Sequence, residues 1–168
     1  EQVNASYLPS TLSLMTIIST PTELITAVPF LLDAYPEDAL VFIALRDGAV
    51  ECAIRRDIPQ EWSDEEVDEL LVPVQESNPE ELLILAYLPP TIEKERSEKF
   101  LSELHAQAEV IAPVKDFLII HGARWRSFLC KDQSCCDPRG QKLPDIQSSA
   151  IAAEHVFQGL LMPAGLRS

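Results

Sequence analysis

The sequence predicts an α/β protein, a three-layer domain with a mixed, mainly parallel central sheet, two β-hairpins and about four helices. Apolar runs of strand length alternate with stretches of helical periodicity, and strands separated by helices favour right-handed crossovers between parallel neighbours. Two of the apolar runs, residues 39–45 and 82–88, are continuous, which is typical of strands covered on both faces. Tight-turn signals at Asp47-Gly48 and at His121-Gly122 add antiparallel hairpins.

The chain is expected to begin with a disordered leader over residues 1–11, followed by a single α/β domain over residues 12–168. A short apolar run at residues 12–18 predicts the first strand. A helix then begins at Thr20, whose hydroxyl caps the first turn in a capping box with Glu23.

Pro29 falls inside this helix and is expected to kink it or split it in two. The later elements follow from apolar periodicity and from capping residues. In chain order they are strands at residues 39–45 and 50–56, a helix capped by Ser63, a strand at 82–88, a helix capped by Thr91, strands at 114–120 and 124–130, and a final helix at 148–161 with Ile151, Ala152, His155 and Val156 facing inward.

The charge balance restricts the partners. The chain has 27 acidic and 13 basic residues and a net charge of −14, so nucleic acid and anionic membranes would repel it. No apolar run approaches the length of about 20 residues that a membrane helix needs, and no signal peptide is apparent. These features predict a cytoplasmic protein with no nucleic-acid or membrane partner. Motifs for phosphate loops, nucleophile elbows and zinc proteases are absent, so the sequence names no reaction, no cofactor and no oligomeric state.

One segment departs from the acidic average. Residues 115–142 contain six lysines and arginines against three aspartates. Within this segment Arg124 and Arg126 lie two residues apart in a predicted strand and therefore share one face, along with Phe128 and Cys130. Two adjacent guanidinium groups repel each other unless a carboxylate from elsewhere in the chain or a bound anion neutralises their charge. Both interpretations stay open.

Cys130, Cys135 and Cys136 form a cluster, whereas Cys52 is expected to be a small buried side chain. Reduced thiols that pack a tight loop are one interpretation of the cluster. A disulfide from Cys130 to Cys135 or Cys136, or a redox-active thiol beside basic residues, is another. A zinc site is the third, but adjacent cysteines rarely both reach one ion, so we predict no bound metal.

A thiol-based enzyme would need a thiolate within hydrogen-bond reach of a base. His121 and His155 are the candidate bases. His121 is the better placed, because it ends a core strand, where open α/β sheets usually bind ligands. Neither histidine lies at a spacing from the cysteines that indicates a catalytic pair.

Two separated strings resemble signatures of the actinobacterial family named domain of unknown function 4192. Residues 20–32, followed by residues 36–41, are similar to its opening signature, and residues 149–154 are similar to its closing helix. The second signature is met within the cysteine segment by Arg124, Ser127, Cys130, Cys135, Cys136, Pro138 and Gly140. The resemblance implies a cytosolic bacterial protein and directs attention to the cysteine loop, without implying an activity.

The chain departs from the family pattern at four positions. Asp33 stands where the family has glycine, Ala39 where it has serine, His121 where an acidic residue is frequent, and Arg139 where glutamate is common. The family's chemistry therefore cannot depend on His121 or Ala39.

The main functional hypothesis is a binding site for a small anionic compound. Its residues belong to the basic strand and the cysteine segment: Arg124, Arg126, Ser127, Cys130, Cys135, Cys136, Arg139 and Gly140. One alternative is a non-enzymatic protein-interaction module with a structural cysteine loop, in which acidic side chains neutralise the arginines. The thiol-based enzyme is the other.

Overall fold

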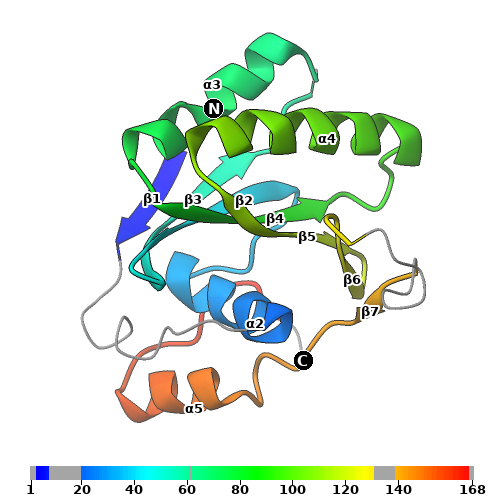
Figure 1. The fold of residues 1–168 in the computed structure, drawn as a ribbon. Helices are drawn as coiled ribbons and strands as arrows, with labels where there is room; N and C mark the ends of the chain where they lie inside the picture. The colour runs from blue at the N-terminus through cyan, green and yellow to red at the C-terminus, as the bar shows by residue number, and fades with distance from the viewer. Residues whose placement is uncertain (1–2, 8–19, 61, 131–138, 167–168) are drawn as a thin grey trace.

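In the computed structural model, which describes residues 3–7, 20–60, 62–130 and 139–166, helices lie on both sides of one mixed sheet (Figure 1). The strands of the described residues have the order β1-β3-β2-β4-β5-β6-β7. The strands are β1 (Val3–Tyr7), β2 (Ala39–Arg46), β3 (Ala49–Asp57), β4 (Glu81–Leu88), β5 (Val114–His121), β6 (Arg124–Ser127) and β7 (Gln141–Lys142), and the helices are α2 (Pro21–Leu32), α3 (Asp64–Glu76), α4 (Lys94–Ile111) and α5 (Ala150–Phe157). The α/β class predicted from the sequence is confirmed.

The sheet is mainly antiparallel, so the prediction of a mainly parallel sheet is wrong. β4 and β5 are parallel neighbours, and the other neighbouring pairs of described strands are antiparallel. The cause is the hairpin of β2 and β3. Helix α3 does connect two strands of the same direction, β3 and β4, but β2 lies between them and runs the opposite way.

Two apolar cores lie on opposite faces of the sheet. One packs α3 and α4 against the sheet and includes Phe117 and Phe128. The other packs α2 against the opposite face and includes Trp125 (Figure 1). Nearly every residue of β2 and β4 is buried because both faces of these strands are covered. Their continuous apolar sequences follow from this position in the sheet.

Residues 3–7 form the edge strand β1 and pair with β3, although they belong to the segment 1–11 that was predicted to be a disordered leader. The local sequence does not signal this strand, because it contains no apolar run. Its backbone pairs with the edge of β3, and such pairing is a long-range event. The strand predicted at residues 12–18 lies outside the described residues.

Helices α2 and α3 begin where their capping residues predict. The Thr20 hydroxyl accepts a hydrogen bond from the Glu23 backbone N–H at 3.2 Å, and the Ser63 hydroxyl accepts one from the Glu66 N–H at 3.2 Å. Each bond satisfies a donor that the first turn of a helix leaves without an intrahelical partner.

Of the two effects predicted for Pro29, a kink or a split, the split does not occur, and the predicted cap of helix α4 is wrong. Helix α2 continues past Pro29 without splitting, because the residues on both sides of the proline are buried and packing holds the helix together. Helix α4 begins after Glu93 rather than at the predicted cap Thr91. The Ile92 N–H donates to the Pro89 carbonyl, so Thr91 belongs to a turn that precedes the helix.

The C-terminal part of the chain differs most from prediction. β6 ends before Cys130, the short strand β7 was not predicted, and α5 is shorter than expected. Of the residues predicted to face inward, Ala152 is buried and Val156 is 55% exposed. Helix α5 packs beside α2 in a small cluster with Phe30, and its Ile151 also packs against the core on the α2 face. None of the described helices is long and apolar enough to span a bilayer.

Candidate functional site

The Arg124 side chain lies where β6 and β7 pair, and backbone carbonyls hold it. Its Nε donates to the carbonyl oxygens of Gly140 at 3.1 Å and Arg139 at 3.2 Å, and its Nη2 donates to the Gly140 oxygen at 2.8 Å. These bonds use the side of the guanidinium that carries Nε and Nη2. A guanidinium has five N–H donors, and Nη1 makes no hydrogen bond to any described residue. Arg124 is therefore fixed in orientation, and a fork of donors on Nη1 and Nη2 is left free by the residues that the structure describes.

Gly140 makes this anchor possible. Its φ is +83°, in the left-handed region that residues with a Cβ rarely adopt. A Cβ atom at this position would lie 2.6 Å from the Trp125 carbonyl oxygen. The backbone thus approaches β6 more closely than any other residue type permits, and this approach brings the Gly140 carbonyl to Arg124.

Three basic side chains line up across β5, β6 and β7. His121 is paired with Arg124 in the register of β5 and β6, and Arg124 is paired with Lys142 in the register of β6 and β7. Directly paired residues of an antiparallel pair project from the same face, with Cα atoms about 4.5–5.5 Å apart. All three residues are exposed. We call His121, Arg124 and Lys142 the basic row.

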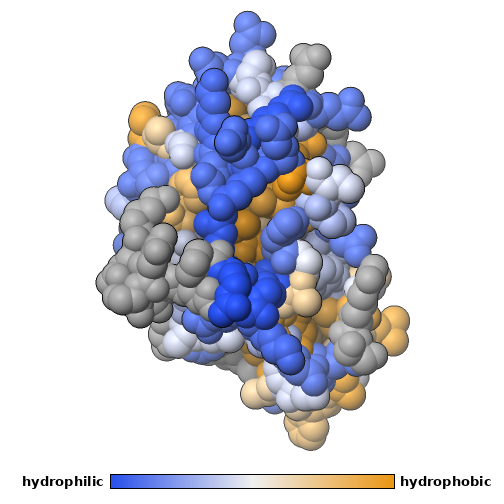
Figure 2. Space-filling model, turned by 90° about the vertical axis from the view of Figure 1, so that its right-hand side faces the viewer, coloured by the Kyte–Doolittle hydropathy of each residue, from blue (hydrophilic) through white to orange (hydrophobic). Residues whose placement is uncertain are grey.

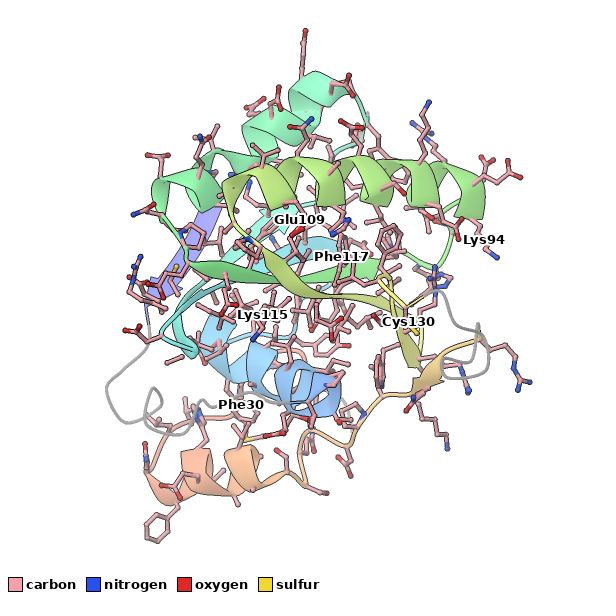
Figure 3. All side chains as sticks on the ribbon, in the orientation of Figure 1. Phe30, Lys94, Glu109, Lys115, Phe117 and Cys130 are labelled. Carbon is pink, nitrogen blue, oxygen red and sulfur yellow. The ribbon has the colours of Figure 1, made fainter. Side chains whose placement is uncertain are left out.

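The basic row lies at the end of the sheet where the parallel strands β4 and β5 terminate, a common position for ligands in α/β proteins. Lys94 in the first turn of α4 and Cys130 lie at this same end of the molecule (Figure 3). Figure 2, which views this end, shows a band of hydrophilic residues down its middle with hydrophobic side chains beside it.

No carboxylate among the described residues neutralises the charge of Arg124 or Lys142. Within the described part of the chain, no Asp or Glu lies within ion-pair distance of His121, Arg124 or Lys142. The carbonyl oxygens that hold Arg124 are dipoles without net charge, so they orient the guanidinium and leave its charge in place. Like charges directly opposite each other destabilise a sheet. An anion bound at this row would remove that repulsion.

Arg126 lies two residues along β6 and faces α4. Its Nη2 is 3.8 Å from a carboxylate oxygen of Glu98, and the two side chains are 31% and 47% exposed. Exposed pairs at this distance contribute little, between 0 and about 1 kcal/mol. The contact places Arg126, and with it Arg124, on the α4 face of the sheet, since alternate residues of a strand share a face.

Ser127 does not lie with the arginines. It pairs with Leu118, which belongs to the core on the α2 face. Its hydroxyl donates to Oδ1 of Asp116 at 3.2 Å. The structure therefore brings together Arg124, Arg126, Arg139 and Gly140 from the predicted site, and places Ser127 on the opposite face.

Cys130 is disulfide-bonded, which agrees with the disulfide interpretation of the cluster and not with reduced thiols at this residue. Cys135 and Cys136 lie outside the described residues. No group of three or more His, Cys, Asp or Glu side chains gathers closely enough to hold a metal ion in residues 3–7, 20–60, 62–130 and 139–166.

Cys52 carries a free thiol that is buried in the core of the α3 and α4 face. Burial raises its pKa above the ordinary value, and the nearby Glu51 carboxylate raises it further. We expect iodoacetamide at pH 8 to leave Cys52 unmodified in the native protein and to modify it after unfolding in urea, as measured by peptide mass spectrometry. Rapid native modification would show that this thiol is accessible and ionised.

Sequence reasoning missed Lys142 as a site residue and gave His121 little weight. Both were visible as basic residues, but the pairing that aligns them with Arg124 was not. β7 consists of two residues, Gln141 and Lys142, and so short a strand has no periodicity to detect. The sequence does indicate a turn at Gly140, directly after the cysteine segment, because glycine favours turns.

Comparison with known proteins identifies a family. A family model described as a domain of unknown function (DUF4192) matches residues 21–167. No curated protein matches the chain, and no solved structure matches it. The family match covers most of the chain and includes both segments whose residues resemble the family signatures. This chain belongs to the family of the domain of unknown function DUF4192.

Proposed function

We propose that this domain binds a small anionic ligand at the basic row, with the free fork of Arg124 as its main contact. The observation that carries the proposal is the anchoring of Arg124 by the carbonyls of Arg139 and Gly140. An arginine held by carboxylates would already be neutralised. An arginine held by carbonyls is oriented and still charged.

Pre-organisation strengthens binding, because the ligand does not have to order the side chain. An arginine on a flexible stem loses rotamer entropy when it binds, whereas Arg124 is already held by three hydrogen bonds. Its free donors can form two parallel bonds to a carboxylate or phosphate, the bidentate geometry that makes arginine a strong oxyanion ligand.

Other residues of the predicted site support the binding of the anion without being its main contact. Arg126 adds positive charge on the same face, with its weak contact to Glu98. Gly140 and Arg139 supply the carbonyls that hold Arg124. Cys130, which is disulfide-bonded, lies three residues after the end of β6. Cys135 and Cys136 stay in the proposal as predicted members of the same loop.

The net charge of −14 supports a small ligand in place of a polyanion. A long nucleic acid or an anionic membrane would face the acidic surface as well as the basic row, and repulsion would grow with its size. We propose accordingly that the protein acts in the cytoplasm without nucleic-acid or membrane partners. The protein-interaction module remains the alternative, and it would need no unpaired arginine.

A thermal-shift comparison tests the proposal. Acetate, citrate, sulfate and inorganic phosphate would be added at equal ionic strength to the wild type, to Arg124→Gln and to the control Lys115→Gln. Lys115 is exposed and lies near the beginning of β5, away from the basic row (Figure 3). A ligand at ten times its Kd stabilises the folded state by about 1.4 kcal/mol, a Tm rise of roughly 3–6 °C for a protein of this size.

We expect at least one of these anions to raise the Tm of the wild type and of Lys115→Gln by this amount, and to leave Arg124→Gln unchanged. Equal shifts in all three proteins would mean that the anions act elsewhere, and no shift in any of them would favour the interaction module. Because Arg124 also helps to hold β7, circular dichroism of Arg124→Gln would confirm that the variant is folded before the comparison is made.

A further inference from the structure

The basic row offers more donors than a simple carboxylate can use. A carboxylate has two oxygens, and the free fork of Arg124 supplies two donors for them. His121 and Lys142 lie on either side of Arg124, one strand away in each direction. A monocarboxylate on Arg124 has one negative charge, so it would balance the charge of Arg124 and leave that of Lys142 unbalanced.

We infer that the ligand is a small phosphate monoester, recognised through its terminal phosphoryl group; this inference rests on the proposed function. A phosphoryl group has three terminal oxygens and carries close to two negative charges above pH 7. Two of its oxygens fit the fork of Arg124. The third is within the lateral reach of a flanking residue, because neighbouring strands are only about 4.8 Å apart.

The two flanking residues contribute in different ways. Lys142 brings a full positive charge on a long stem with three rotatable donors. His121 brings a ring N–H, which a histidine has in both its neutral and its charged form. Both side chains are exposed, and neither forms a hydrogen bond or an ion pair with a side chain of the described residues. The second negative charge of a phosphate monoester is thus met by Lys142.

The acidic surroundings favour a doubly charged small ligand over a longer one. Glu98 lies near Arg126 on the same side of the sheet, and the whole chain has a net charge of −14. The basic row is therefore a local group of positive side chains in a chain that is acidic as a whole. Such a site binds a ligand whose negative charge is concentrated in one group more tightly than a ligand whose charge is spread along a chain.

Three probes of similar size separate charge from shape. Methyl phosphate at pH 8 is a tetrahedral dianion, methyl sulfate is a tetrahedral monoanion, and acetate is a planar monoanion. Isothermal titration calorimetry at constant ionic strength would compare their affinities for the wild type. We expect methyl phosphate to bind at least about tenfold more tightly than the other two, which corresponds to one further charge-assisted hydrogen bond.

Lys142→Gln is the variant that tests the inference most directly, because it leaves the anchor of Arg124 intact. We expect it to weaken methyl phosphate about tenfold and to change methyl sulfate and acetate little, so that the preference is lost. His121→Ala should weaken methyl phosphate by a smaller factor, and Lys115→Gln should leave all three affinities unchanged. A far-UV spectrum and an urea midpoint equal to those of the wild type would show that each variant is folded.

The outcomes separate this inference from the proposed function. If acetate or methyl sulfate binds as tightly as methyl phosphate and Arg124→Gln abolishes both, the domain binds anions but does not select phosphate esters. If Lys142→Gln keeps the full preference, the dianion is not recognised by the basic row. If none of the probes binds the wild type, both the inference and the proposed function fail.

Discussion

Phe117→Ala is expected to lower the free energy of unfolding by about 3–5 kcal/mol, the range for a buried aromatic residue cut back to alanine. Phe117 is fully buried in the core between β5 and α4. Its ring packs against Phe128 at 4.9 Å between centroids and against His105 at 6.1 Å. The truncation removes these contacts and leaves a cavity that the sheet cannot close. Urea unfolding followed by circular dichroism measures the loss.

Phe157→Ala is the matched control, because Phe157 is 85% exposed on α5. An exposed side chain with few contacts should change the unfolding free energy by no more than about 0.5 kcal/mol. A loss for Phe117→Ala as small as that for Phe157→Ala would contradict the packing of β5 beneath α4. Because His121 is the last residue of β5, such a result would also contradict the position of His121 in the basic row.

Gly140→Ala is expected to destabilise the protein by about 2–6 kcal/mol and to abolish anion binding at the basic row. The left-handed backbone costs a residue with a Cβ about 1–3 kcal/mol. The new Cβ would also lie 2.6 Å from the Trp125 carbonyl oxygen, and relieving that clash moves β7 away from β6 at a similar cost. The movement withdraws the carbonyl that holds Arg124. Urea unfolding and the calorimetric titration described above measure the two effects.

Gly122→Ala separates the two costs. Gly122 has a φ of +63°, and a Cβ there would have no atom of the described residues within 4 Å apart from its chain neighbours, so alanine would add the backbone cost without the clash. We expect a smaller loss of stability, about 1–2 kcal/mol, and unchanged binding if the turn keeps its shape. Equal effects of the two substitutions would show that the close approach of Gly140 to β6 is not what positions Arg124.

The candidate site was predictable in part. The excess of basic residues in the segment 115–142 is visible in the sequence, and the two-residue spacing indicated that Arg124 and Arg126 share a face, as the structure has them. The same alternation places Ser127 on the opposite face. Ser127 is also part of the family signature, and a signature does not distinguish a residue that binds a ligand from one that shapes the strand.

What the sequence determined by itself is local. The Asp47-Gly48 turn, with positive φ at both residues, the caps of α2 and α3, and the buried strands β2 and β4 depend on a few neighbouring residues, and each was predicted close to its observed position. The sequence also indicated the family, because the residues that resemble its signatures occur in the same order along the chain. These elements can be predicted from the sequence because propensity, capping and burial depend on residues within one helical turn or one strand.

Tertiary structure alone decided the direction of the strands and the composition of the basic row. A buried strand has the same apolar sequence whether its neighbour is parallel or antiparallel, so the placement of β2 between β3 and β4 was not encoded in any local pattern. His121, Arg124 and Lys142 meet through two registers, one of which depends on the close approach of Gly140 to Trp125. Strand pairing joins residues that are distant in the chain, and only folding brings their backbones within hydrogen-bond reach.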